Sequence, residues 1–352
     1  MTVTTEFVTL ASPLLLDSGR KLADVTIAYE SYGDPSSEVV LVCHALSGDA
    51  HAAGVTAGVQ GAGETDVQGL GWWDAAIGSG RALDTDRWRV ICTNLVGGCR
   101  GSTGPASTDP ATGSPYGSTF PELTVADLVR AQRQFLDALG IDRIRAAVGA
   151  SLGGMQAVQL ALDCPDVVDG VIAIASTARL DAQGVALNAI ARKAITSDPD
   201  FQGGDYYGSG RAPRAGLELA RQIGHVTYLS KEALGAKAGT DRLRVEDYLE
   251  HQGAKFADRF DANTYLRFSR ALTRFELSDD QLARIEAPVL VVSFSSDWLY
   301  PPEDSARLAS ALPHASHVEL DTAHGHDSFL LDVDLQAPHV RAFLDRLSEE
   351  QR

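Results

Sequence analysis

The sequence predicts an α/β fold, with a mostly parallel sheet flanked by helices and a helical insertion. Short continuous apolar runs recur along the chain, as expected for strands buried on both faces of a parallel sheet. Segments with apolar residues at helical spacing lie between them. From about residue 179 to 284 the pattern is helical without a convincing buried strand. We therefore expect a first core part (1–178), a helical lid (179–284) and a second core part (285–352).

The first predicted elements are strands. Residues 23–32 alternate like a half-exposed strand and predict an antiparallel hairpin with residues 7–16. Residues 39–44 form a continuous apolar run, and the loop that follows, 44–48, lies where open α/β sheets place their ligand sites. His44 is expected to shape this loop. The glycine-rich stretch 54–71 predicts a mobile loop.

The next segments are a strand, a glycine-rich loop and a helix. Residues 88–94 predict a strand, and the loop 97–105 follows it. Its glycine spacing fits neither a P-loop nor a dinucleotide fingerprint, so we expect a structural or active-site rim loop. Residues 124–139 predict a helix that Thr124 caps and Gly140 ends.

The stretch around Ser151 predicts a strand, a sharp turn and a helix. Residues 146–148 are apolar, and apolar residues at helical spacing follow from Met155. Gly149 and Gly153 flank Ser151 in the pattern G-x-S-x-G. In such a nucleophile elbow the serine has a strained backbone, and a Cβ at either glycine would collide with neighbouring backbone. Ser151 is therefore the candidate nucleophile, although glycines and a serine can also make a simple tight turn.

The second half resumes the alternation of strands and helices around the lid. Strands are predicted at 171–175, 288–294 and 317–320, lid helices at 185–195, 216–229, 245–260 and 264–275, and later helices at 305–312 and within 340–347.

Composition excludes several partner classes. The 352 residues include 47 acidic and 30 basic side chains, a net charge of −17, so nucleic acid and anionic membranes are poor partners. The four cysteines show no paired spacing, and no signal or membrane-spanning segment is evident. We expect a cytoplasmic protein.

A serine nucleophile needs a base and an acid that orients the base. In the α/β-hydrolase layout both follow the serine, each just past a late strand. Asp297 directly follows a predicted late strand and is therefore the candidate acid. Its alternative role is that of a turn residue or a helix cap. His324 and His326 both lie just past the last predicted strand and are the candidates for the base. The pair could instead bind a metal, but no further ligands at zinc-like spacing accompany it, so no metal site is predicted.

Several segments together resemble the homoserine O-acetyltransferases of the α/β-hydrolase fold, across nearly the whole chain. They are Cys43–Gly48, Gly71–Asp74, Asn94–Pro105, Gly149–Gln156, Gly203–Tyr207, Ser296–Asp297 and Gly325–Leu330. The stretch 54–69 departs from the family pattern.

The resemblance implies acetyl transfer from acetyl-CoA to L-homoserine in methionine synthesis, with no cofactor. It also implies that His326 is the base, that Arg221, Tyr228 and Asp327 contact substrate, and that the lid pairs two chains into a homodimer. A guanidinium suits the carboxylate of an amino acid and a carboxylate suits its ammonium. We expect both charges to be buried.

The implied mechanism is double displacement. Ser151 takes the acyl group, His326 and Asp297 move the proton, and the N–H groups of Leu46 and Leu152 bind the oxyanion. Succinyl-CoA as donor and L-serine as acceptor are the nearest alternatives. An esterase and a catalytically silent binding protein are more remote.

Overall fold

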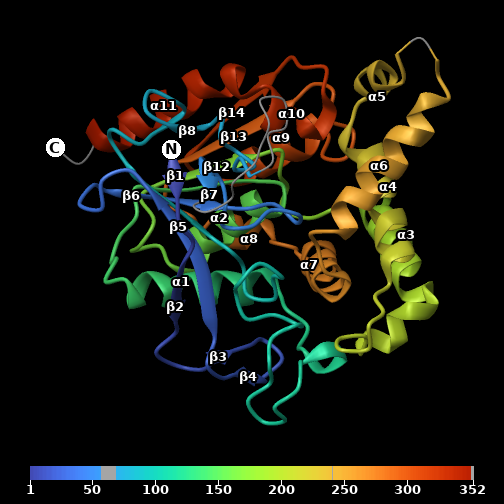
Figure 1. Ribbon diagram of the computed structural model, residues 1–352. Helices are drawn as coiled ribbons and strands as arrows, with labels where there is room; N and C mark the ends of the chain where they lie inside the picture. Colours follow the sequence, from blue (N-terminus) through green and yellow to red (C-terminus); the bar gives the residue numbers. More distant parts are fainter. Residues whose placement is uncertain (57–68, 240, 350–352) are drawn as a thin grey trace.

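The computed structural model describes residues 1–56, 69–239 and 241–349, so most of the predicted mobile loop 54–71 lies outside the described residues. An eight-stranded sheet forms the centre (Figure 1), in the order β14-β13-β12-β11-β6-β10-β5-β2. Its strands are β2 (Glu6–Thr9), β5 (Thr26–Tyr32), β6 (Val39–Cys43), β10 (Arg89–Thr93), β11 (Ala146–Ala150), β12 (Val171–Ile174), β13 (Val289–Phe294) and β14 (Ala315–Leu320). Pairing is parallel from β14 to β10. It is antiparallel at β5 and β2, which confirms the predicted hairpin and the mostly parallel sheet.

Within the described residues, three short strand pairs lie outside this sheet: β1 (Thr2–Val3) with β7 (Val55–Thr56), β3 (Leu14–Leu15) with β4 (Lys21–Leu22), and β8 (Ile77–Gly78) with β9 (Leu83–Asp84).

Apolar cores lie on both faces of the sheet. Alternate residues of β6 enter different cores: Leu41 joins the one that includes α1 (Val125–Ala138), α2 (Leu152–Asp163) and α9 (Pro302–Ala311). Val42 joins the one that includes α11 (Val333–Glu349). Every residue of β6, β11, β12 and β13 is buried, because side chains on both faces are covered. This explains the continuous apolar runs in the sequence.

The helical insertion lies between β12 and β13 and stands to one side of the core (Figure 1). It consists of α3 (Ala182–Ser197), the 3-10 turn η2 (Pro199–Gly204), α4 (Arg214–Tyr228), α5 (Lys231–Ala238), α6 (Arg244–Ala257), α7 (Ala262–Arg274) and α8 (Asp279–Leu282). The four predicted lid helices are present, and α5 was not predicted. The two ends of the insertion meet where the Leu277 N–H donates to the Ala178 carbonyl at 3.0 Å. The exact division of the chain at 178 and 284 stays a prediction.

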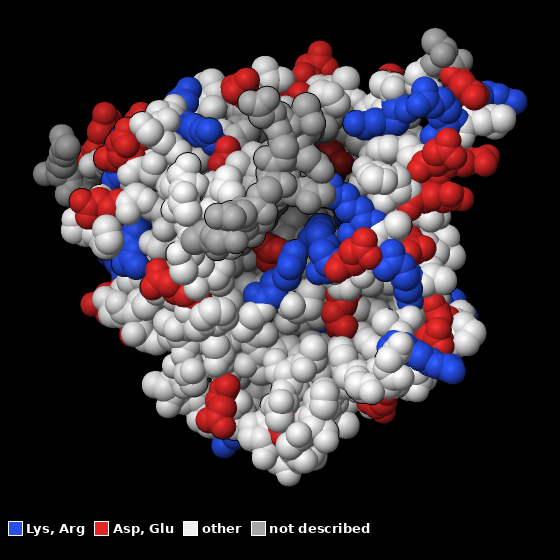
Figure 2. All heavy atoms as spheres, in the orientation of Figure 1, with Lys and Arg blue, Asp and Glu red and all other residues white. Residues whose placement is uncertain are grey.

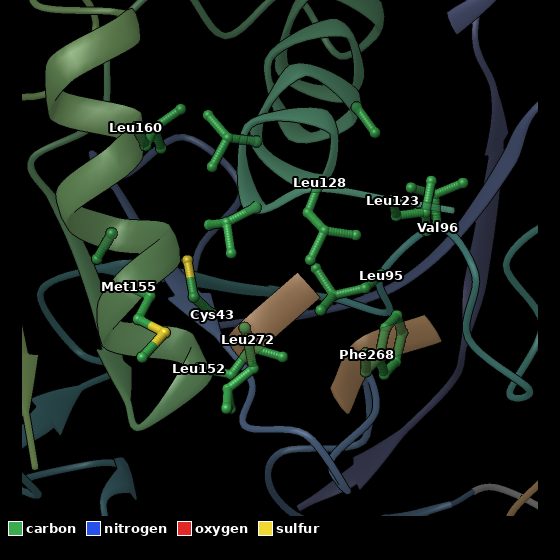
Figure 3. Packing of buried hydrophobic residues seen from close by; sticks show 14 of the residues in the cluster. Cys43, Leu95, Val96, Leu123, Leu128, Leu152, Met155, Leu160, Phe268 and Leu272 are labelled. Carbon is green, nitrogen blue, oxygen red and sulfur yellow. The ribbon is translucent and has the colours of Figure 1, made fainter. Parts of the chain in front are cut away.

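Helix α7 anchors the lid in the core behind the elbow. Figure 3 shows Phe268 and Leu272 of α7 near Leu95, Cys43 and Leu152, with Met155 of α2 beside them. The remaining elements are η1 (Gly117–Thr119), η3 (Gly325–Asp327) and α10 (Ser328–Leu331). Thr124 caps α1 as predicted. None of the described helices is both long and apolar enough to cross a lipid bilayer.

Candidate active site

Ser151 occupies the predicted sharp turn between β11 and α2. Its φ of 55° and ψ of −122° lie in a region that non-glycine residues rarely adopt. A Cβ on Gly153 would lie 2.0 Å from the Cys43 carbonyl oxygen, and one on Gly149 would lie 2.4 Å from the Gly153 backbone. Only glycine at both positions lets α2 pack this closely on β6 and β11, which holds Ser151 at the end of the sheet.

His326 and Asp297 form a buried pair. The His326 Nδ1 lies 2.7 Å from Asp297 Oδ2, and the backbone N–H groups of Leu299 and Tyr300 donate to Oδ1 at 3.0 and 2.9 Å. Because a carboxylate only accepts hydrogen bonds, the proton sits on Nδ1 and the lone pair on Nε2. The imidazole therefore has the tautomer of a general base.

His324, the other candidate base, points elsewhere. Its Nδ1 lies 2.9 Å from a carboxylate oxygen of Asp332, and its ring is partly exposed, whereas the His326 ring is buried. The structure thus brings His326, and not His324, to Asp297.

Tyr300 connects the nucleophile to the base. Its ring stacks on the His326 imidazole, with ring centroids 4.8 Å apart and planes at 17°. Burial raises the pKa of Tyr300 above the usual value for a phenol, and a hydrogen bond with the Ser151 side chain opposes the rise. Sequence reasoning missed Tyr300, for which the only available signal was its position three residues after Asp297.

Two backbone N–H groups are free beside the elbow. The Gly48 N–H donates to the Ala45 carbonyl at 3.0 Å and closes a turn over residues 45–48. Among the described residues, the N–H groups of Leu46 in this turn and Leu152 at the start of α2 have no hydrogen-bond acceptor. Two such donors near a serine suit a developing oxyanion.

His44 fixes the orientation of the Leu46 N–H. The buried ring accepts the Leu95 N–H at Nε2 (3.2 Å), so Nδ1 carries the proton and donates to the Ala45 carbonyl at 2.7 Å. Burial lowers the pKa of His44 and favours this neutral form. Because the peptide that joins Ala45 to Leu46 is planar and trans, holding its oxygen also aims its N–H in the opposite direction.

Two buried glutamines join this turn to the elbow. Gln156 Nε2 donates to the carbonyls of His44 and Leu152 at 3.0 Å each, and Gln132 Nε2 donates to Gln156 Oε1 at 3.1 Å. Neither glutamine was predicted, because nothing in the local pattern distinguishes them from ordinary helix residues. They hold the two free N–H groups in one rigid unit.

The predicted substrate contacts lie beside this unit. Arg221 Nη1 is 3.4 Å from Ser47 Oγ, and its guanidinium carbon lies 5.5 Å from the centre of the Tyr228 ring. Among the described residues, no carboxylate forms an ion pair with Arg221, and Asp327 makes no side-chain hydrogen bond. Arg221 and Asp327 are partly buried, and Arg221 Nε is fully buried without a hydrogen-bond partner among the described residues, so the expectation of burial is met in part. Arg221 belongs to the lid helix α4 and Asp327 to the core element η3, and Figure 2 shows Lys and Arg side chains gathered between the core and the lid.

The surroundings of Asp327 and Tyr228 shift their pKa values. Burial raises the pKa of the Asp327 carboxyl, while His326 and Arg221 lower it. Burial also raises the pKa of Tyr228, and Arg221 opposes the rise. Opposite charges thus lie close to the candidate base and influence each other.

A strained serine, a buried His–Asp pair and two free N–H groups define an enzyme built for acyl transfer on an α/β-hydrolase fold. The α/β-hydrolase fold family model matches residues 38–333. A homoserine O-succinyltransferase of Alkalilimnicola ehrlichii is 44% identical over 96% of this chain and 94% of its own. A homoserine O-acetyltransferase of Methanosphaerula palustris is 46% identical over 97% of this chain and 73% of its own. The chain belongs to this family of homoserine O-acetyltransferases and O-succinyltransferases.

Solved structures agree with this fold. The homoserine O-acetyltransferase of Bacillus anthracis superposes with a TM-score of 0.87 at 27% identity, over 98% of both chains. Esterase E22 superposes with a TM-score of 0.86 at 28% identity, over 97% of this chain and all of its own. The same architecture therefore occurs in proteins named for different acyl acceptors.

Proposed function

We propose that this protein transfers an acyl group from an acyl-CoA to the side-chain hydroxyl of L-homoserine. The observation that carries the proposal is the opposite charges of Arg221 and Asp327 beside the His326–Asp297 pair. Neither charge has an ion-pair partner among the described residues. A free amino acid supplies both missing partners, a carboxylate for the guanidinium and an ammonium for the carboxylate. Water, the acyl acceptor of an esterase, requires neither the guanidinium nor the carboxylate.

The reaction follows a double displacement. The Ser151 hydroxyl gives its proton to His326 Nε2 as Oγ attacks the thioester carbonyl, and the N–H groups of Leu46 and Leu152 stabilise the tetrahedral oxyanion. The C–S bond breaks, and His326 returns the proton to the leaving thiolate. His326 then takes the proton of the homoserine hydroxyl, whose oxygen attacks the acyl-serine carbonyl. The bond from the acyl carbon to Ser151 Oγ breaks, His326 returns the proton to Oγ, and the O-acyl product leaves. Asp297 orients the imidazole throughout.

The donor we propose is acetyl-CoA, on the sequence resemblance, used as a substrate without any further cofactor. Succinyl-CoA is the second candidate, because relatives of 42 to 47% identity are named for it. A cytoplasmic location, where acyl-CoA is made, completes the proposal.

A homodimer through the lid is also proposed. Several large apolar side chains of the lid are exposed, which a monomer would leave in water. They are Val185, Ile190, Leu219, Val226 and Leu243. Light scattering at micromolar concentration should give twice the chain mass. A chain that stays monomeric there contradicts the proposal.

Mass spectrometry tests the central step. The protein mixed with acetyl-CoA or succinyl-CoA alone should gain one acyl group on Ser151, and Ser151→Ala should gain none. Homoserine should then remove the group faster than water does. Label on another residue, or faster loss to water, refutes the proposal. Homoserine and L-serine offered together at equal concentration test the acceptor, and predominant O-acylserine would overturn that assignment.

A further inference from the structure

Arg259 reaches from the lid to the turn that carries Leu46. It lies between α6 and α7, and its Nη1 donates to the Ser47 carbonyl at 3.1 Å, across 212 positions of sequence. We propose that Arg259 is a positioning residue that sets the oxyanion hole through this carbonyl. The inference rests on the proposed role of the Leu46 N–H.

The position of Arg259 is electrostatically unfavourable. Burial lowers the pKa of Arg259, and the neighbouring Arg221 lowers it further by repulsion. Within the described part of the chain, no carboxylate lies within ion-pair distance of Arg259. Placing two like charges together in a partly desolvated place opposes folding. Among the described residues its one polar contact is the Ser47 carbonyl, which points to a role in the turn.

The lid holds the guanidinium in place. The Phe256 ring is buried, and the guanidinium carbons of Arg221 and Arg259 lie 4.8 and 5.3 Å from its centre, distances that give cation–π attraction. The Phe256 ring also stacks on Phe260 with centroids 4.7 Å apart. Asp261 caps α7 directly afterwards. Packing on Phe256 and the adjacent cap of α7 thus restrict the motion of the Arg259 side chain. This limits the conformational entropy that is lost when the guanidinium binds the Ser47 carbonyl.

The turn 45–48 is held on both sides of Leu46. His44 and the Gly48 N–H hold the Ala45 carbonyl before it, and Arg259 holds the Ser47 carbonyl after it. With both oxygens fixed, the Leu46 N–H can rotate only if one of these bonds breaks. The Ser47 hydroxyl also meets Arg221. Of these two contacts between the lid and the turn, only the one from Arg259 holds the backbone, so we assign the coupling between the lid and the oxyanion hole to Arg259.

The test uses the whole protein and p-nitrophenyl acetate, a neutral ester without an anionic group. Arg259→Ala removes the contact, Arg259→Lys retains a charged donor, and Arg244→Ala on α6 is the control, because Arg244 is exposed and makes no side-chain bond among the described residues. Stopped-flow absorbance gives the rate constant of Ser151 acylation at saturating ester. The KM for homoserine and the unfolding midpoint are measured alongside.

Arg259→Ala should slow acylation by about 10- to 100-fold, less than the ~10²–10³-fold for loss of a whole oxyanion donor. Arg259→Lys and added guanidinium ion should restore part of the rate, and Arg244→Ala should match the parent. An unchanged acylation rate, a loss confined to the KM for homoserine, or a loss that follows the unfolding midpoint would each overturn the inference. Acylation of Ser151 by the ester does not depend on homoserine, so failure of the proposed acceptor would show separately.

Discussion

Two amide substitutions of His44 separate the two hydrogen bonds of its imidazole. An asparagine amide can reproduce the Nδ1 donor and a glutamine amide the Nε2 acceptor. In His44→Gln the Ala45 carbonyl loses the 2.7 Å bond and keeps only the Gly48 N–H. We expect acylation of Ser151 to slow by roughly 10- to 100-fold, because an oxyanion donor removed outright costs ~10²–10³-fold.

His44→Asn should have the opposite effects. It retains the bond to Ala45 and leaves the buried Leu95 N–H without the acceptor seen at 3.2 Å. The free energy of unfolding should fall by about 1–3 kcal/mol, while acylation stays within about threefold of the parent. Burst kinetics and denaturant titration measure the two quantities. If His44→Asn slows acylation more than His44→Gln, the planar-peptide argument is wrong.

Three other predictions concern the base, the acceptor site and a buried pair. His326→Ala should lower kcat by about 10³-fold or more, and His324→Ala should have a far smaller effect; the reverse order of activities would mean that the base is misassigned. Asp327→Asn should lower kcat/KM for homoserine by roughly 100-fold and leave a neutral ester unaffected, and equal loss with both substrates would contradict an ammonium contact. His51 faces a carboxylate of Glu30 at 2.9 Å and a carbonyl at 2.8 Å, two acceptors that both need a ring proton, and the bond to Glu30 raises the pKa of His51. The stability that His51 adds over His51→Gln should be complete below its unfolded pKa of about 6.5 and lost as pH rises through the higher folded value; a difference in unfolding free energy that does not vary with pH would refute this.

The sequence was most informative where one local pattern decides the structure. Buried strands such as β6 appear as continuous apolar runs, and Gly149 and Gly153 indicate the elbow because their spacing is local. Helix α5 was missed because its eight residues have only one apolar side chain larger than alanine. The start of α11 was missed because Pro338 lies inside it.

The site residues that the sequence could not indicate are those whose partners lie far away along the chain. Asp297 and His326 were candidates because the fold fixes their order, and the choice between His324 and His326 came only from the resemblance. Tyr300, Gln156 and Arg259 have partners set by tertiary packing. No spacing in the sequence reports that a residue of the lid meets Ser47 from 212 positions away.

The insertion leaves and rejoins the core at neighbouring points, which the hydrogen bond between Leu277 and Ala178 joins. Because entry and exit points are neighbours, closing the insertion constrains the core little, and its length can change at a small entropic cost. Ser151, Asp297 and His326 all lie outside the insertion, whereas Arg221 and Tyr228 lie within it. Mutations around Arg221 and Tyr228 can therefore alter the acceptor preference while Ser151, Asp297 and His326 are inherited unchanged, and a new specificity does not require a new catalyst.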